Sequence, residues 1–133
     1  MNVPARGAWT RLGIGRNGGP LRDEGPAVWL QIGEFYADSR GFAGTTAFDG
    51  EAVSFRHEVG APGEDVGRLA VAGDHLIETG TNPDGSTFFE VWRPLPDDGC
   101  AGGAWLSASA QIVRVGRHVV HVDGTGGTYW SLP

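Results

Sequence analysis

The chain has 133 residues, of which 40% are hydrophobic, and this fits one domain with a single core. Its formal net charge is -6, and all ten basic residues are arginines. An acidic chain of this kind is a poor partner for nucleic acid or for anionic membranes. The lack of lysine excludes Schiff-base chemistry and the lysine of a phosphate-binding P-loop.

Cysteine usage and hydropathy indicate the cellular compartment. The single cysteine, Cys100, has no partner for an internal disulfide, and the first seven residues contain no apolar stretch typical of a signal peptide. No segment approaches the roughly 18 apolar residues that a membrane-spanning helix needs. We therefore expect a cytoplasmic protein, either a monomer or a homodimer, with no membrane partner.

Short segments of alternating apolar and polar residues follow one another along the chain, separated by turns centred on glycine. This pattern predicts antiparallel strands joined by hairpins. A polar loop rich in glycine and proline is expected at 15–26, so that residues 1–25 form a partly flexible N-terminal segment, and a second loose segment at 94–103. The expected strands cover residues 8–14, 27–32, 35–40, 42–48, 51–59, 67–72, 75–79, 87–93, 105–115, 118–123 and 128–132.

These strands predict an all-β fold, a single antiparallel meander β-barrel of about 8–10 strands that spans residues 1–133. A meander of this size closes on itself because closure removes its exposed edges. A closed barrel of this kind has an interior that can hold a ligand.

The turn at Gly33-Glu34 fixes which side chains of the first hairpin share a face. Trp29, Gln31, Tyr36 and Asp38 lie on one face, while the other face is the more apolar one. Alternation alone leaves two interpretations open. The first face either lines the barrel interior or meets solvent.

Several short motifs between residues 28 and 93 occur in a particular order: Trp29-Leu30-Gln31, Tyr36-Ala37-Asp38-Ser39-Arg40, Phe42-Ala43-Gly44, His57, Asp65-Val66-Gly67, Gly73-Asp74-His75-Leu76-Ile77-Glu78 and Glu90-Val91-Trp92-Arg93. This series resembles the lipocalin-like Hri family of fungi and its short bacterial relatives. The resemblance implies a calycin-type barrel and says little about activity.

Residues of these motifs form the candidate ligand site. A cavity that binds a small organic molecule needs aromatic walls and a few fixed polar groups. The alternative is that the charged members form structural ion pairs. The candidates are Trp29, Gln31, Tyr36, Asp38, Arg40, His57, Glu78, Glu90 and Trp92.

The histidines give candidates for proton transfer and for haem. His57 shares its face with Phe48, Val53 and Phe55, so it is either an acid-base group, a haem ligand or a core histidine hydrogen-bonded to a carboxylate. We predict no metal site and no cofactor, since His118 and His121 lie on opposite faces of a strand. Haem bound by His121 is the alternative.

Three functions follow from the sequence. The first is a barrel that binds a small hydrophobic or aromatic molecule in its interior. The second is a cofactor-free enzyme of secondary metabolism that cyclises, isomerises or dehydrates a small metabolite, with Asp38, His57 or Glu78 as the catalytic group. The third is a protein-interaction module whose barrel is filled by its own side chains.

Overall fold

The computed structural model describes residues 6–60, 62–99 and 101–133, so Cys100 lies outside the described part. Twelve strands occur within these ranges. They are β1 (Arg6–Arg16), β2 (Val28–Ile32), β3 (Phe35–Asp38), β4 (Phe42–Asp49), β5 (Ala52–Val59), β6 (Gly63–Ala72), β7 (His75–Thr81), β8 (Thr87–Pro94), β9 (Gly102–Leu106), β10 (Ala110–Val115), β11 (His118–Asp123) and β12 (Gly126–Ser131).

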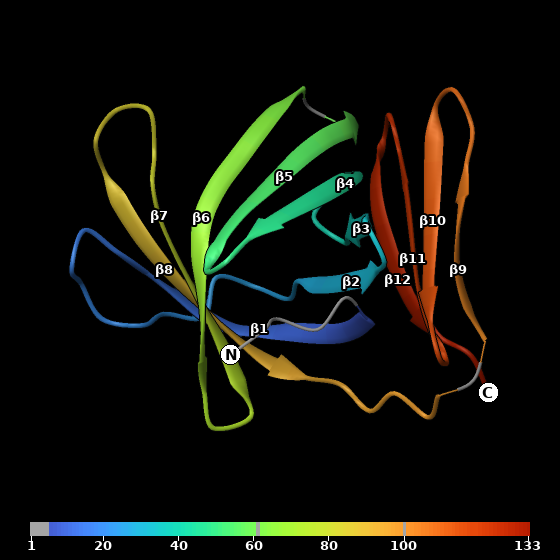
Figure 1. Ribbon diagram of the computed structural model, residues 1–133, viewed down its shortest axis with the longest axis horizontal. Coiled ribbons are helices and arrows are strands. Elements are labelled where there is room, and N and C mark those ends of the chain that lie inside the picture. The colour runs from blue at the N-terminus through green and yellow to red at the C-terminus, as the bar shows by residue number, and fades with distance from the viewer. Residues whose placement is uncertain (1–5, 61, 100) are drawn as a thin grey trace.

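Strands β1 to β8 form a closed antiparallel barrel in which each strand pairs with the next and β8 pairs with β1 (Figure 1). This confirms the predicted all-β meander barrel. The first hairpin has the register that its Gly33-Glu34 turn requires: Trp29 pairs with Asp38 and Gln31 with Tyr36, so these four side chains share one face as expected. The turn between these strands begins at Gly33, whose φ of 57° is left-handed, as hairpin turns of this length require.

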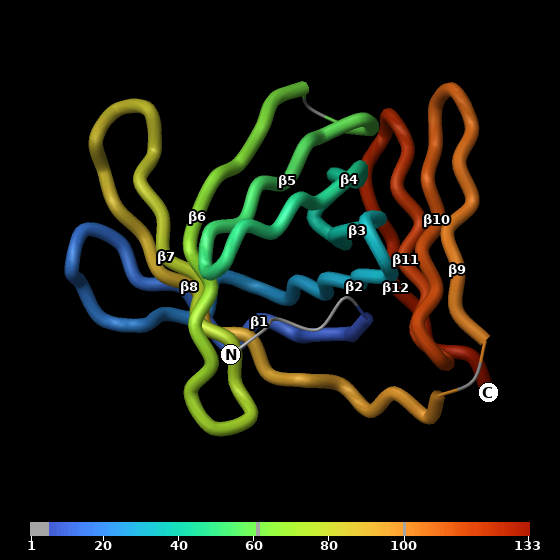
Figure 2. Tube along the Cα trace, viewed as in Figure 1, coloured from blue at the N-terminus to red at the C-terminus, as the bar shows by residue number. Residues whose placement is uncertain are grey.

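Strands β9 to β12 do not extend the barrel. They form a separate sheet in the order β12-β11-β10-β9. The chain leaves the barrel after β8, runs along its outside and enters this second sheet, which stands at one side of the barrel (Figures 1 and 2). Strands β10 and β11 contact the outer face of β2 and β3.

A core of apolar side chains fills the space between the barrel wall and the second sheet. Leu30 and Ala37 contribute from the barrel, and Val113 and Val120 contribute from the second sheet, each with 0% of its surface exposed. The apolar face of the β2–β3 hairpin therefore packs against the second sheet. The opposite face, with Trp29 and Tyr36, lies within the barrel and does not meet solvent.

Gln111 on β10 connects the second sheet to the barrel. Its Nε2 donates hydrogen bonds to the backbone oxygens of Tyr36 at 2.9 Å and Gly44 at 3.0 Å, and the side chain is buried. The register of β4 with β5 shifts between Ala43 and Gly44, which is a β-bulge. A Cβ atom at Gly44 would collide with the backbone oxygen of Arg56, so only glycine fits here.

Candidate functional site

An aromatic cluster occupies the middle of the barrel. Trp29 stacks on Trp9 with ring centroids 4.5 Å apart, and the edges of Phe55 and Trp92 meet it at 5.4 Å and 5.8 Å. Tyr36 adds an edge contact to Phe55 at 5.0 Å. These rings come from five different strands, so the cluster holds the barrel wall together from inside.

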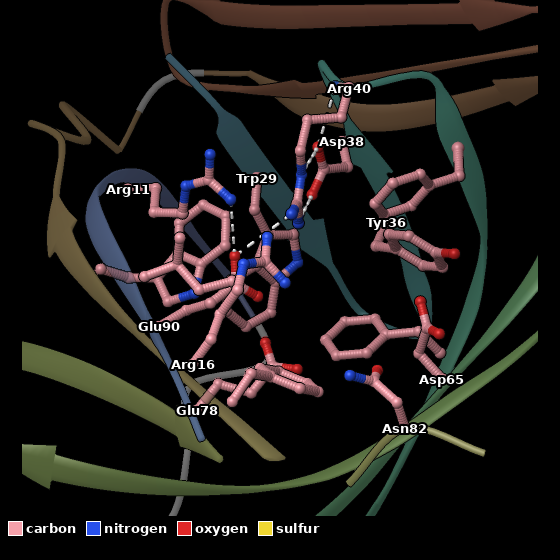
Figure 3. A pocket seen from close by; sticks show the side chains of 15 residues that line it. Arg11, Arg16, Trp29, Tyr36, Asp38, Arg40, Asp65, Glu78, Asn82 and Glu90 are labelled. Carbon is pink, nitrogen blue, oxygen red and sulfur yellow. Dashed lines mark hydrogen bonds and ion pairs between the residues drawn. The ribbon is translucent and has the colours of Figure 1, made fainter. Parts of the chain in front are cut away.

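A cavity of about 250 Å³ lies beside this cluster (Figure 3). The exposed side chains of Arg16 and Asp65 mark its open end. The β1–β2 loop and the β7–β8 hairpin lie side by side near this end, joined by a backbone hydrogen bond from Asn17 to Thr87. The lining residues are Arg11, Ile14, Arg16, Trp29, Tyr36, Asp38, Arg40, Phe42, Phe55, Asp65, Glu78, Asn82, Phe88, Glu90 and Trp92.

Four charged side chains form a continuous network along one side of the cavity (Figure 3). The Oε2 atom of Glu90 accepts hydrogen bonds from Arg11 Nη1 at 2.9 Å and from Arg40 Nη1 at 3.1 Å. The Arg40 side chain also donates two hydrogen bonds to the Asp38 carboxylate, at 3.0 Å and 2.8 Å. Burial works to lower the pKa of Arg40, but the hydrogen bonds and negative charge of Asp38 outweigh it and raise that pKa.

Glu78 lies outside this network, although it is buried. It sits on β7, directly opposite Glu90 on β8, and only 7% of its surface is exposed. Its carboxyl points into the cavity (Figure 3), and within the described residues it has no hydrogen-bond or ion-pair partner. Burial, followed by the charge of Glu90, raises the pKa of Glu78 to about 8. Glu78 is therefore largely protonated at neutral pH.

Three further polar atoms around the cavity are buried without a partner within the described residues. They are Arg11 Nε, the Tyr36 hydroxyl and Trp92 Nε1. Burial also raises the pKa of Tyr36, which keeps its hydroxyl protonated. Unpaired buried polar groups are costly and therefore rare. Here they are concentrated in residues that line one cavity.

The structure brings most of the predicted site residues together. Trp29, Tyr36, Asp38, Arg40, Glu78, Glu90 and Trp92 all line the cavity, whereas Gln31 and His57 do not. The Gln31 side chain accepts hydrogen bonds from Trp29 Nε1 and the Thr46 hydroxyl and donates one to the backbone oxygen of Gly33. Gln31 therefore holds the indole ring of Trp29 in its place within the aromatic cluster.

The histidines singled out by sequence have other surroundings. His57 makes a 2.9 Å contact between Nε2 and Asp65 Oδ2 and stacks on Phe42 at 4.9 Å, next to the cavity but outside its lining. This agrees with the interpretation of His57 as a histidine paired with a carboxylate. His121 lies on β11 of the second sheet, away from the barrel interior.

Several cavity residues were not predicted, above all Arg11, Ile14 and Arg16 on β1. A register shift between Arg11 and Gly13 interrupts the alternation of β1, and it lets Arg11 and Ile14 face the same cavity although they are three positions apart. Strict alternation from Trp9 places Ile14 on the wrong face. Gly13 is the sequence signal for this bulge.

Comparison with known proteins adds no family assignment, since no family model, curated protein or solved structure matches the chain. In the part of the chain that the structure describes, no helix has the length and apolar character needed to cross a membrane. Among the same residues, no group of three or more histidine, cysteine, aspartate or glutamate side chains is arranged to hold a metal ion.

Proposed function

We propose that this protein is a small-molecule-binding β-barrel, akin to the lipocalin-like barrels that its motifs resemble, and that it holds a small and largely aromatic ligand. The observation that carries this proposal is the cavity beside the tryptophan cluster, which combines aromatic walls with fixed charged groups. Ligand sites in proteins have this composition.

The size of the cavity limits the ligand. Sites for drug-sized molecules measure about 300–1,000 Å³, and this cavity of about 250 Å³ falls just below that range. A compact molecule built around a single ring system fits such a space. The presence of the cavity also counts against the hypothesis of a barrel filled by its own side chains.

The polar groups of the site are held in position before any ligand binds. Arg40 is fixed by Asp38 and Glu90 together, and Glu90 is fixed by Arg11 as well. A site organised in this way loses little conformational freedom when the ligand binds, and this favours affinity. Such an arrangement supports selective recognition by the barrel interior.

Binding can be tested with a variant that fills the cavity. Ile14 is 5% exposed and lines the cavity, whereas Leu12 on the same strand is 40% exposed. Native mass spectrometry of the purified protein should show a bound small molecule in the wild type and in Leu12→Phe, and none in Ile14→Phe. Circular dichroism should show that all three proteins are folded. A ligand retained equally by Ile14→Phe would contradict the proposal, as would a wild type that binds no small aromatic compound in an NMR screen.

A proton-transfer enzyme is the second candidate, and Glu78 is the observation that favours it. Asp38 is engaged by both the side chain and the backbone N–H of Arg40, and His57 lies outside the cavity lining, so Glu78 remains as the acid or base. An enzyme of this kind would exchange a carbon-bound proton of its ligand for deuterium in D₂O. A carrier would return the ligand unlabelled.

A further inference from the structure

Most charged side chains around the cavity pair with one another, and the carboxyl of Glu78 is the exception. Arg11 and Arg40 bind Glu90 and Asp38. At the open end, Arg16 pairs with Glu24 at 2.7 Å and Asp65 contacts His57 at 2.9 Å. Glu78 alone among the cavity carboxyls has no hydrogen-bond or ion-pair partner within the described residues.

The charges that line the cavity do not compensate an ionised Glu78, because its four carboxyls (Asp38, Asp65, Glu78 and Glu90) outnumber its three arginines (Arg11, Arg16 and Arg40). Burial raises the pKa of Glu78 most, followed by the charge of Glu90 on β8; Asp38 and Asp65 add to the rise, and the Arg40 guanidinium opposes it. A positive charge placed here is attracted, whereas a second negative charge is repelled.

Aromatic rings stand around the same space. Trp29, Phe55, Phe88 and Trp92 line the cavity together with Glu78. The faces of such rings attract cations, most strongly when water is excluded. One example is already present, because the Arg40 guanidinium lies 5.6 Å from the centroid of the Trp92 ring.

From the unpaired carboxyl, the excess of one carboxyl over the arginines of the cavity and the aromatic walls, we infer that the ligand is a small organic monocation. Specifically, it is an arylalkyl amine in its protonated form, whose ammonium group pairs with Glu78 while its ring packs against the tryptophans. This inference rests on the proposed binding function and specifies its ligand class. The cation supplies the partner that Glu78 lacks, and a buried carboxylate needs such a partner to be ionised.

Three probes of the same shape and different charge test the inference: 2-phenylethylammonium, 2-phenylethanol and phenylacetate. Their affinities for the wild type, for Glu78→Gln and for Glu34→Gln, which changes an exposed carboxyl in the β2–β3 turn, can be measured by calorimetry and NMR. We expect the ammonium compound to bind wild type and Glu34→Gln at least tenfold more tightly than the alcohol. Glu78→Gln should lose this preference and keep its affinity for the alcohol.

The pH dependence gives a second readout that needs no variant. Glu78 must lose its proton to pair with the ammonium group, so binding releases a proton, and affinity should fall about tenfold for each pH unit below about 8. Calorimetry in buffers of different ionisation enthalpy measures this proton release in the wild type. The measurement remains decisive if Glu78→Gln does not fold.

The outcomes separate the two proposals. If the alcohol binds as tightly as the ammonium compound, or if no proton is released, the ligand is not a cation and the binding function stands. If phenylacetate binds best, the inference is also wrong. If none of the three probes binds and the purified protein carries no ligand, both the inference and the proposed function fail.

Discussion

Glu78 and Glu90 lie directly opposite each other on β7 and β8, yet arginines bind only Glu90. The two carboxyls belong to the same cavity and are nearly equally buried, with 7% and 4% of their surface exposed. The two carboxyls therefore differ in their ion-pair partners and not in how deeply they are buried. Glu90 organises the fixed side of the site, and Glu78 remains available to a ligand.

Replacing Glu78 by glutamine should make the protein more stable at high pH. Because the pKa of Glu78 is raised from 4.5 to about 8 in the folded state, that state binds more protons than the unfolded chain between these values. Wild-type stability therefore falls as pH rises through this window, by about 1.4 kcal/mol per pH unit at most. Urea unfolding from pH 4 to 9 should show a difference between Glu78→Gln and wild type that grows with pH and levels off above the window. A difference that is constant with pH, or that also appears in Glu34→Gln, would contradict the assignment.

Removing Arg11 should weaken the fold much more than removing Arg16. The Arg11–Glu90 pair is buried, with each side chain 6% exposed, and breaking a buried pair costs up to about 3–5 kcal/mol. Glu90 keeps Arg40 as a second partner, so we expect a loss of about 2–3 kcal/mol. Arg16 pairs with Glu24 at the surface, so Arg16→Met serves as the matched control and should change stability little. The free energies of unfolding of Arg11→Met and Arg16→Met give the comparison. Equal losses would show that Arg11 is not part of the structural network.

Replacing Gln111 by leucine should loosen the second sheet from the barrel. The substitution removes two hydrogen bonds and leaves the backbone oxygens of Tyr36 and Gly44 buried without this donor, at a cost of about 1–3 kcal/mol. Hydrogen exchange should become faster in β10 and β11 while the β6–β8 amides keep their protection. Replacement of the exposed Thr128 by valine should leave both sets of amides unchanged.

Gly44→Ala should be among the most damaging small substitutions in the chain. The added Cβ would meet the backbone oxygen of Arg56, and relief requires the strands β4 and β5 to move apart, with a cost of about 1–3 kcal/mol or more. Gly124→Ala is the control, since no atom lies within 4 Å of the position its Cβ would take. A drop in melting temperature in Gly44→Ala alone is expected. Equal behaviour of the two variants would contradict the close approach at Gly44.

The sequence predicts the barrel because its signals are local. Glycine turns define the hairpins, and each turn fixes the register of its two strands, as the Trp29–Asp38 pair shows. The second sheet could not be predicted in this way, because hairpin signals in β9–β12 look the same whether the strands extend a barrel or form a sheet of their own. The long loose segment at 94–103 was the sequence feature that could have marked the boundary between the barrel and the second sheet.

The candidate site was predicted in part for the same reason. Trp29, Tyr36 and Asp38 share a face by simple alternation, and the structure places that face inside the barrel. Arg11 was missed because its importance depends on Glu90, which is 79 positions away. Ile14 was missed because a bulge shifts the alternation of β1. Local periodicity does not predict contacts between distant segments. It also does not predict where a regular strand is interrupted.

The burial of the β2–β3 hairpin on both of its faces has a consequence for engineering the barrel. Every residue of Val28–Ile32 and Phe35–Asp38 serves either the core under the second sheet or the barrel interior, so no position there is free to vary. The wall formed by β6 and β7 has exposed outward residues such as Val66, Arg68 and Thr79. Substitutions meant to leave the fold intact should therefore keep the first hairpin constant and be directed to these outward positions of β6 and β7.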